Sequence, residues 1–328
     1  MIVDVVRVAG APCPTLVIDR DRLPRGSLAL RDELIALRRW LHRTGRGEIG
    51  KIALYGASHD PAHDLDYRFV QSLSGGFDFR TGCGHSLLAC VVATGRPGPV
   101  RVRALTTNDT VVCEPEPGGG AYTVRLNRPA PARPLLPTGR PVDSVDGLRV
   151  SLVDFGNPYV FVDTADLGLP APGDLRSAEG DVLDRLLRVR ARAARLLGLP
   201  AHGALPKIAA VAAYGAGGLT VRAVTTTGWH PSLALTGAAC LTAAATVPGT
   251  VPHRLAGHGR GAAPGPYTLR VDTPGGPVSA SAHASAAAPA DAKGHASGSR
   301  LHAVGVHGKH ATVLERALPL PWRIRVTA

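Results

Sequence analysis

Lysine and aromatic residues are scarce in this chain of 328 residues. Aromatic side chains make up 4% of the sequence, and nearly all of its positive charge is arginine, spread along the chain without a dense run. Sites for nucleic acids combine basic patches with aromatic stacking platforms, so the net charge of +12 does not by itself indicate nucleic-acid binding. A basic surface of this kind would still attract small anionic molecules. The lysines are Lys51, Lys207, Lys293 and Lys309.

Cysteine is sparse as well, and long apolar runs are missing. The five cysteines are widely spaced and form no Cys-x-x-Cys pair, which argues against a disulfide framework and against a zinc site. No window approaches the roughly 20 uninterrupted apolar residues of a membrane span. The N-terminal apolar run is too short, and too soon followed by charge, for a signal peptide. We therefore expect a cytoplasmic protein with free thiols and with neither a membrane nor a nucleic acid as partner.

The remaining composition favours a folded protein of two domains. Hydrophobic residues make up 45% of the chain, enough for a sizeable core, and the length exceeds the usual size of one domain. Residues 129–141 are rich in proline and arginine and form the best candidate linker. We expect an α+β protein with an N-terminal half, residues 1–138, rejoined by strands from 308–328, and a C-terminal half, residues 139–307.

The same order of elements recurs in the two halves. Gly84–Thr94 and Leu233–Thr246 are apolar on every face, which is typical of buried helices. Lys-Ile-Ala precedes each of them, at residues 51–53 and 207–209. This parallel predicts an internal duplication with two pseudo-symmetric domains, each a β-rich layer wrapped round one buried helix. Further helices are expected at 27–43 and 177–197, a mobile loop or a degenerate hairpin at 279–300, and closing strands within 311–327.

Cys83 is the strongest candidate for chemistry. It lies between two glycines at the start of the first apolar helix, where free amide N–H groups and the helix dipole lower a thiol pKa and attract carboxylates. Cys90 and Cys240 lie inside the apolar helices and are expected to fill the core. Lys51 begins a predicted strand, where a lysine is usually solvated. Because lysine is rare in this chain, a functional role for Lys51 is kept open beside the solvated one.

Other polar residues are weaker candidates. His230 could bind a carboxylate or cap the second helix, and Asn157 could donate its amide to a substrate or simply form a turn. The remaining histidines show no metal-site spacing, so no metal is expected. The glycine-rich stretches lack the Lys-Ser/Thr of a phosphate loop, so no nucleotide cofactor is expected either.

An ordered set of motifs resembles the 2-methylaconitate cis-trans isomerase (PrpF) family, which has the diaminopimelate-epimerase-like fold. Gly-Cys-Gly-His opens the first apolar helix, and Phe-Gly-Asn-Pro-Tyr-Val-Phe-Val follows at 155–162. Pro-Lys-Ile-Ala at 206–209, Thr-Gly-Ala-Ala at 236–239 and Val-Pro-Gly-Thr at 247–250 complete the set in the family's order. The similarity extends over nearly the whole chain, from the 14–24 segment to the final strands.

The resemblance implies an isomerase without cofactor or metal, which moves a proton at an allylic carbon of a small unsaturated carboxylate. The acid/base lysine and cysteine of the family correspond to Lys51 and Cys83. Substrate contacts are expected from both halves, and a homodimer is one option for the assembly. The expected binding residues are Gly84, His85, Ser86, Cys13, Asn157, His230, Thr236 and Gly237.

The chain also departs from the family. Epimerases of this fold carry a second cysteine at the second helix start, where this chain has Leu235, so a two-thiol epimerase is not expected. The substrate-binding Arg-Gly-Gly-Thr-Ser-Lys element is replaced by Ala-Gly-Ala-Pro-Cys-Pro-Thr at 9–15, with Cys13 at the serine position, and His85 replaces an asparagine. Two alternatives stay open: an epimerase or cyclase that uses His85 or His230 as second base, and a non-catalytic binding protein for anionic metabolites.

Overall fold

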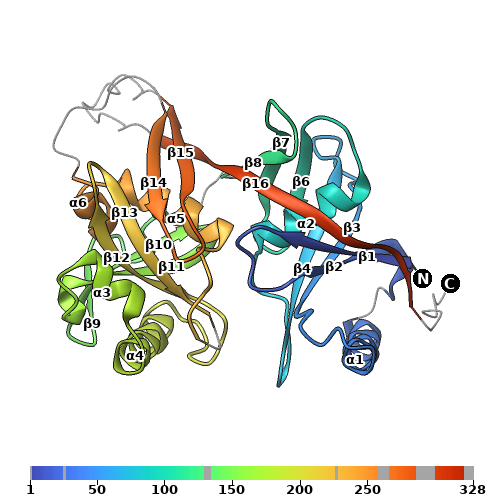
Figure 1. Ribbon diagram of the computed structural model, residues 1–328, viewed down its shortest axis with the longest axis horizontal. Helices are drawn as coiled ribbons and strands as arrows, with labels where there is room; N and C mark the ends of the chain where they lie inside the picture. Colours follow the sequence, from blue (N-terminus) through green and yellow to red (C-terminus); the bar gives the residue numbers. More distant parts are fainter. Residues whose placement is uncertain are drawn as a thin grey trace. The chain divides into compact units, whose positions relative to one another are not determined.

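The chain divides into two units, and its last long strand takes part in both. The computed structural model (Figure 1) describes residues 2–24, 27–128, 134–225, 228–257, 266–285 and 300–320. Unit 1 comprises residues 1–124 and 309–328, and unit 2 comprises residues 125–308. Strand β16 (Arg300–Pro319) begins in unit 2 and ends in unit 1. Residues from the C-terminal end of the chain therefore complete the N-terminal unit.

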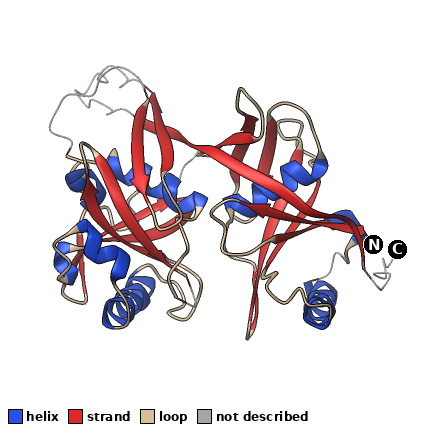
Figure 2. Ribbon diagram, in the orientation of Figure 1, coloured by secondary structure: helices blue, strands red, loops and turns tan. Residues whose placement is uncertain are grey.

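Strands predominate in unit 1, with the helices set against them (Figure 2). Its strands are β1 (Ile2–Val8), β2 (Thr15–Asp19), β3 (Lys51–Ala57), β4 (Leu65–Leu73), β5 (Gly76–Asp78), β6 (Val100–Ala104) and β7 (Asp109–Pro115), followed by β8 (Ala121–Asn127), which runs on into unit 2. Its helices are the short η1 (Arg20–Arg22), α1 (Ser27–Arg43) and α2 (Gly84–Thr94).

Unit 2 has the same mixture of elements. Its strands are β9 (Asp143–Val145), β10 (Leu148–Phe155), β11 (Asn157–Asp163), β12 (Lys207–Tyr214), β13 (Gly218–Val224), β14 (Tyr267–Asp272) and β15 (Val278–Ser285). Its helices are η2 (Ala165–Leu167), α3 (Pro172–Ser177), α4 (Asp181–Leu196), α5 (Leu235–Ala245) and α6 (Val251–Leu255). No helix in the described ranges is long and apolar enough to cross a membrane.

The strands of the two units pair in the same order. In unit 1, β1 is antiparallel to β2, β2 parallel to β3, β3 antiparallel to β4, and β4 parallel to β6. In unit 2, β10 is antiparallel to β11, β11 parallel to β12, β12 antiparallel to β13, and β13 parallel to β14. Parallel neighbours need a crossover. The first crossover carries α1 in unit 1 and α3 and α4 in unit 2, and the second carries α2 in unit 1 and α5 and α6 in unit 2.

The two faces of the unit 1 sheet bury different helices. Residues of β1, β2 and β3 such as Val5, Leu16 and Ile52 form one cluster with Leu37 and Trp40 of the amphipathic helix α1. Because strand side chains alternate between faces, the residues between them point the other way, toward α2, which contacts β1, β2, β3 and β4. The alternating strands of unit 1 therefore lie between one amphipathic helix, α1, and one wholly apolar helix, α2.

The two apolar helices lie close to their predicted positions. Helix α2 has the predicted bounds and ends at Gly95, whose φ of 62° is the left-handed conformation that favours glycine at a helix end. In helix α5, which contacts β10, β11, β14 and β15, every residue is buried. The helix expected at 177–197 is shorter, because it begins at Asp181 after Gly180, whose φ is 42°.

The segment expected to be a mobile loop or a degenerate hairpin contains a strand. Residues 278–285 form β15, and Ala280 and Ala282 are buried in it. There the hairpin alternative is confirmed, because β15 pairs antiparallel with β16, and its small residues fit a strand packed on α5. Residues 286–299 lie outside the described residues. The expected closing strands correspond to β16 as far as Pro319, and residues 321–327 again lie outside.

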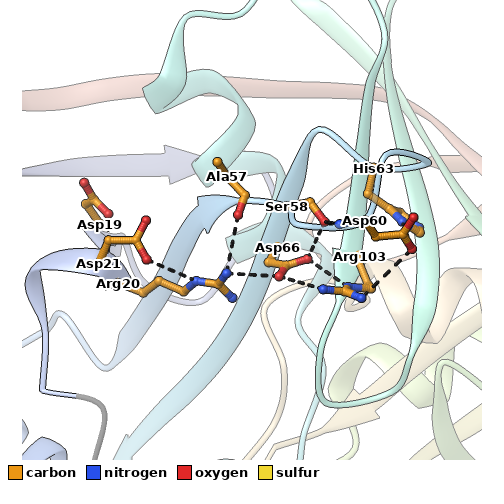
Figure 3. A network of polar contacts seen from close by, with 9 residues as sticks. All are labelled: Asp19, Arg20, Asp21, Ala57, Ser58, Asp60, His63, Asp66 and Arg103. Atoms are coloured by element: carbon orange, nitrogen blue, oxygen red, sulfur yellow. Dashed lines mark hydrogen bonds and ion pairs between the residues drawn. The ribbon is translucent and has the colours of Figure 1, made fainter.

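A buried carboxylate ties together the end of the sheet opposite Lys51 (Figure 3). Asp66 of β4 pairs with Gly56 at the end of β3, and its side chain is 2% exposed. It accepts hydrogen bonds from Arg20, Arg103 and Ser58 at 2.8–3.0 Å. Burial acts to raise the pKa of Asp66, but these hydrogen bonds outweigh it and lower the pKa to about 2. This network holds β4, β6 and the η1 segment in register.

Candidate functional site

Cys83 is the N-cap residue of α2. Its backbone is extended, with φ of −136° and ψ of 105°, so the chain turns into the helix directly after it. The side chain is partly exposed, and the buried Tyr67 donates a hydrogen bond from its hydroxyl to the Cys83 carbonyl at 2.9 Å. The thiol thus lies at the positive end of a buried helix, with its backbone fixed from the sheet.

Two hydroxyl groups connect the thiol to the sheet. Ser86 Oγ donates to Cys83 Sγ at 3.3 Å, and Ser86 Oγ lies 3.0 Å from Thr15 Oγ1 at the start of β2. A serine hydroxyl has one proton, so when Ser86 donates to the sulfur, Thr15 must donate to Ser86. The order of donation is therefore Thr15 to Ser86 to Cys83, and it favours negative charge on the sulfur.

Lys51 lies beside this chain of hydrogen bonds. It is 5% exposed, and it is the register partner of Thr15 in the parallel pair of β2 and β3. Register partners point to the same face, so Lys51 faces α2 together with Thr15. Among the described residues, no hydrogen bond or ion pair holds its ammonium group.

The surroundings lower the pKa of the Cys83 thiol. Burial acts to raise this pKa, but the charge of Lys51, the Ser86 hydroxyl and the amides of Ser86 and His85 act more strongly in the other direction. Burial instead raises the pKa of Cys90, Cys113 and Cys240. The charge of Arg128 acts to lower the pKa of Cys240 but is too weak to offset burial. Among these four thiols, Cys83 alone has a lowered pKa.

The other unit 1 candidates lie close to this centre. Gly84, His85 and Ser86 form the first turn of α2, and all three are buried. Cys13 is partly exposed, and a Cβ added to Gly50, the residue before Lys51, would lie 3.9 Å from its sulfur. The structure therefore gathers Cys13, Lys51, Cys83 and the first turn of α2 at one edge of the sheet.

The unit 2 candidates gather at the start of α5. Asn157 Nδ2 donates to Thr236 Oγ1 at 3.2 Å, and both residues are buried. Gly237 lies against Tyr159: a Cβ added to this glycine would lie 2.8 Å from Tyr159 Cζ. The ring of Tyr159 therefore requires glycine at this position of the helix.

His230 is buried and oriented by the backbone. Its Nδ1 accepts a hydrogen bond from the amide of Ser232 at 3.0 Å. A neutral imidazole that accepts at Nδ1 carries its proton at Nε2, so His230 is a donor at that nitrogen rather than a base. Among the residues that the structure describes, no three His, Cys, Asp or Glu side chains are grouped so that they could hold a metal ion.

The N-cap residue of α5 is Ala234, not Leu235. Leu235, which the sequence predicts to stand in the position of a second cysteine, is the first residue of the helix. Neither Ala234 nor Leu235 has a side chain that can exchange a proton.

Sequence reasoning missed Thr15 and Tyr67. Thr15 is the first residue of a strand whose alternation places it on the α2 face, which is a signal in the sequence, but its contact with Ser86 spans 71 residues. The hydrogen bond from Tyr67 to the Cys83 carbonyl has no signal in the sequence at all.

Comparison with known proteins places the chain in a family. The family model described as PrpF protein matches residues 118–296, more than half of the chain, and the chain belongs to the PrpF family. This match covers most of unit 2 and does not include Lys51 or Cys83.

Relatives of the chain are named isomerases. The (4E)-oxalomesaconate Delta-isomerase of Novosphingobium sp. (strain KA1) is 26% identical over 265 residues, which cover 70% of this chain and 73% of the relative. The putative isomerase YbhH of Escherichia coli (strain K12) is 25% identical over 244 residues, which cover 62% of this chain and 69% of the relative.

Solved structures share the α+β fold. A methylitaconate-delta-isomerase aligns with a TM-score of 0.63 and 20% identity, covering 98% of both chains. A hydroxyproline epimerase from Agrobacterium vitis aligns with a TM-score of 0.57 and 14% identity, covering 98% of this chain and 97% of the other.

Proposed function

We propose that this protein shifts or rotates a carbon–carbon double bond of a small unsaturated carboxylate by allylic proton transfer, with Cys83 and Lys51 as the acid/base pair. The observation that carries the proposal is a buried lysine beside a helix-capping thiol whose pKa is lowered. The relatives' names support the substrate class, since oxalomesaconate and methylitaconate are unsaturated polycarboxylates.

The protonation states of Cys83 and Lys51 fit this reaction. The lowered pKa favours the Cys83 thiolate as base: it takes a proton from the allylic carbon, and the electron pair left behind spreads into a dienolate. The Lys51 ammonium stabilises the developing negative charge and supplies a proton to the other end of the allyl system. Transfer of the proton from the Cys83 thiol to the Lys51 amine then restores the starting state. These steps shift the double bond, whereas rotation of the dienolate and return of the proton to its original carbon would change the geometry instead; neither route requires a cofactor.

The surroundings of the pair support its role. Thr15 and Ser86 direct their hydroxyl protons toward the sulfur, which stabilises the thiolate that the reaction requires. Asn157, His230, Thr236 and Gly237 at the start of α5, together with Cys13 and the first turn of α2, are proposed to contact substrate.

An epimerase on this scaffold is the less favoured reading. It would need a base at the α5 start, where the N-cap residue is Ala234 and where His230 accepts a hydrogen bond from Ser232 at Nδ1. One base at one helix start suits a reaction in which the proton leaves and returns on the same face of the substrate.

Solvent exchange tests the proposal. Proton NMR in D₂O follows the wild type, Cys83→Ala and Cys90→Ala with a panel of unsaturated di- and tricarboxylates. Cys90 is the matched control, because it is a cysteine of the same helix with a raised thiol pKa. We expect deuterium to enter an allylic carbon with the wild type and the control, and to enter at least about 100-fold more slowly with Cys83→Ala. Exchange by Cys83→Ala within twofold of the wild type would overturn the assignment.

A further inference from the structure

Lys309 is a buried lysine for which the described residues offer no partner. It lies in β16, it is 7% exposed, and no hydrogen bond or ion pair within the described ranges holds its ammonium group. Burial lowers the pKa of Lys309. Burying a cation without a partner is unfavourable unless an anion compensates it, so an unpaired buried lysine points to a missing anion.

The strand register places Lys309 on the face that carries Lys51. Lys51, Thr15, Val6 and Val313 form one row across β3, β2, β1 and β16. Register partners share a face, so Val313 also faces α2. Alternation along β16 then turns Lys309 to the same face, and the exposure of the intervening His310 and Thr312 agrees.

Lys309 also lies at the same edge of the sheet as the candidate site. Val8 at the end of β1 is the partner of Ala311, and the Ala9 amide donates to the His310 carbonyl at 2.9 Å. Lys309 is therefore beside the 9–14 segment, which leads through Cys13 to Thr15. That segment contains no basic residue. The nearest arginine on β1, Arg7, is exposed on the opposite face.

We infer that Lys309 binds a second carboxylate of the substrate, so that the site is built for a dicarboxylate spanning Lys309 and the Lys51–Cys83 pair. The inference rests on the proposed function, because it concerns the same site. Two buried ammonium groups on one face of one sheet edge define two anion positions, and a monocarboxylate would satisfy only one of them.

Binding of a saturated dicarboxylate tests the inference without requiring chemistry. Calorimetric titration compares succinate with butyrate, which has the same carbon chain and one carboxylate fewer. The variants are Lys309→Gln and the matched control Arg316→Gln, which removes the same charge from an exposed position of β16. We expect Lys309→Gln to weaken succinate binding at least tenfold and butyrate binding less than threefold, and Arg316→Gln to change neither by more than twofold.

Three results would overturn the inference: wild type that binds succinate no more tightly than butyrate, Lys309→Gln that binds succinate as the wild type does, or equal losses with both variants. Lys309→Met adds a measurement of folding. We expect it to unfold at the wild-type temperature or above, with no further rise on adding succinate. A lower unfolding temperature that succinate raises as it does in the wild type would assign Lys309 a structural role instead. These binding results are independent of the exchange experiment, so failure of the dicarboxylate site and failure of Cys83 as a base are distinguishable.

Discussion

Replacing Asp66 by asparagine should destabilise the protein by an amount that depends on pH. The pKa of Asp66 is lowered from 3.8 to about 2. Each unit of difference between the folded and unfolded pKa is worth about 1.4 kcal/mol, so the ionised carboxylate contributes about 2 kcal/mol at pH 7. Its side chain is only 2% exposed, so solvent screening takes away little of this contribution.

The sign of the pH dependence follows from the direction of the shift. A lowered folded pKa stabilises the protein fully above the unfolded pKa, and this stabilisation is lost as the pH falls through the interval from about 4 to about 2. Roughly half of it remains at pH 3. Asparagine does not titrate, so the difference in unfolding free energy between wild type and Asp66→Asn should shrink by about 1 kcal/mol between pH 7 and pH 3. Any cost of leaving Arg20 and Arg103 unpaired adds a part that does not change with pH over this range.

Urea unfolding at pH 7, 5 and 3 measures this difference. Asp32→Asn is the control, because Asp32 is exposed on α1. Exposed substitutions of this kind usually change stability by less than about 0.5 kcal/mol, and we expect this of the control. A difference for Asp66→Asn below 0.5 kcal/mol at pH 7, or one that is the same at pH 7 and pH 3, would refute the assignment of the lowered pKa to Asp66.

Three further substitutions test the site. Ser86→Ala should raise the pKa of Cys83 and slow its alkylation by iodoacetamide at pH 7 by up to about tenfold, measured as a rate against pH; an unchanged profile would remove Ser86 from the thiolate's support. Lys51→Met should shift the same profile in the same direction and further, because the Lys51 charge is the strongest of the influences that lower this pKa. Gly237→Ala should cost about 1–3 kcal/mol in thermal unfolding, since its Cβ would lie 2.8 Å from Tyr159 Cζ, and full wild-type stability would show that the ring moves aside freely.

Local patterns in the sequence were sufficient for the elements but not for their partners. The two apolar helices could be placed because a helix without a polar face has only one environment, the interior, and because Gly95 marks the end of α2. The segment 278–285 could not be decided between a loop and a hairpin, because its alanines and serines carry no strand signal. Its strand character comes from pairing with β14 and β16, which the composition of the segment does not reveal.

The candidate site divides in the same way. The position of Cys83 between glycines at a helix start can be read from its neighbours. The contact of Thr15 with Ser86 and the place of Lys309 beside the 9–14 segment depend on long-range pairing of strands. The sequence shows which residues are chemically able, and only the register of the strands shows which of them share a sheet edge.

The long strand β16 has a consequence for synthesis of the chain. Its last residues pair with the first strand, Ile2 with Pro319 and Val8 with Ala311. On the ribosome, β1 therefore emerges before β16 and keeps one edge open until about 300 further residues have been added, on the order of 15–60 s at usual rates of elongation. During this interval Lys309 has not yet been synthesised, so unit 1 lacks the residue that we propose to bind the second carboxylate. An unpaired edge of Ile and Val residues over that time is a site for wrong pairing, and it makes this protein a candidate for chaperone protection during synthesis.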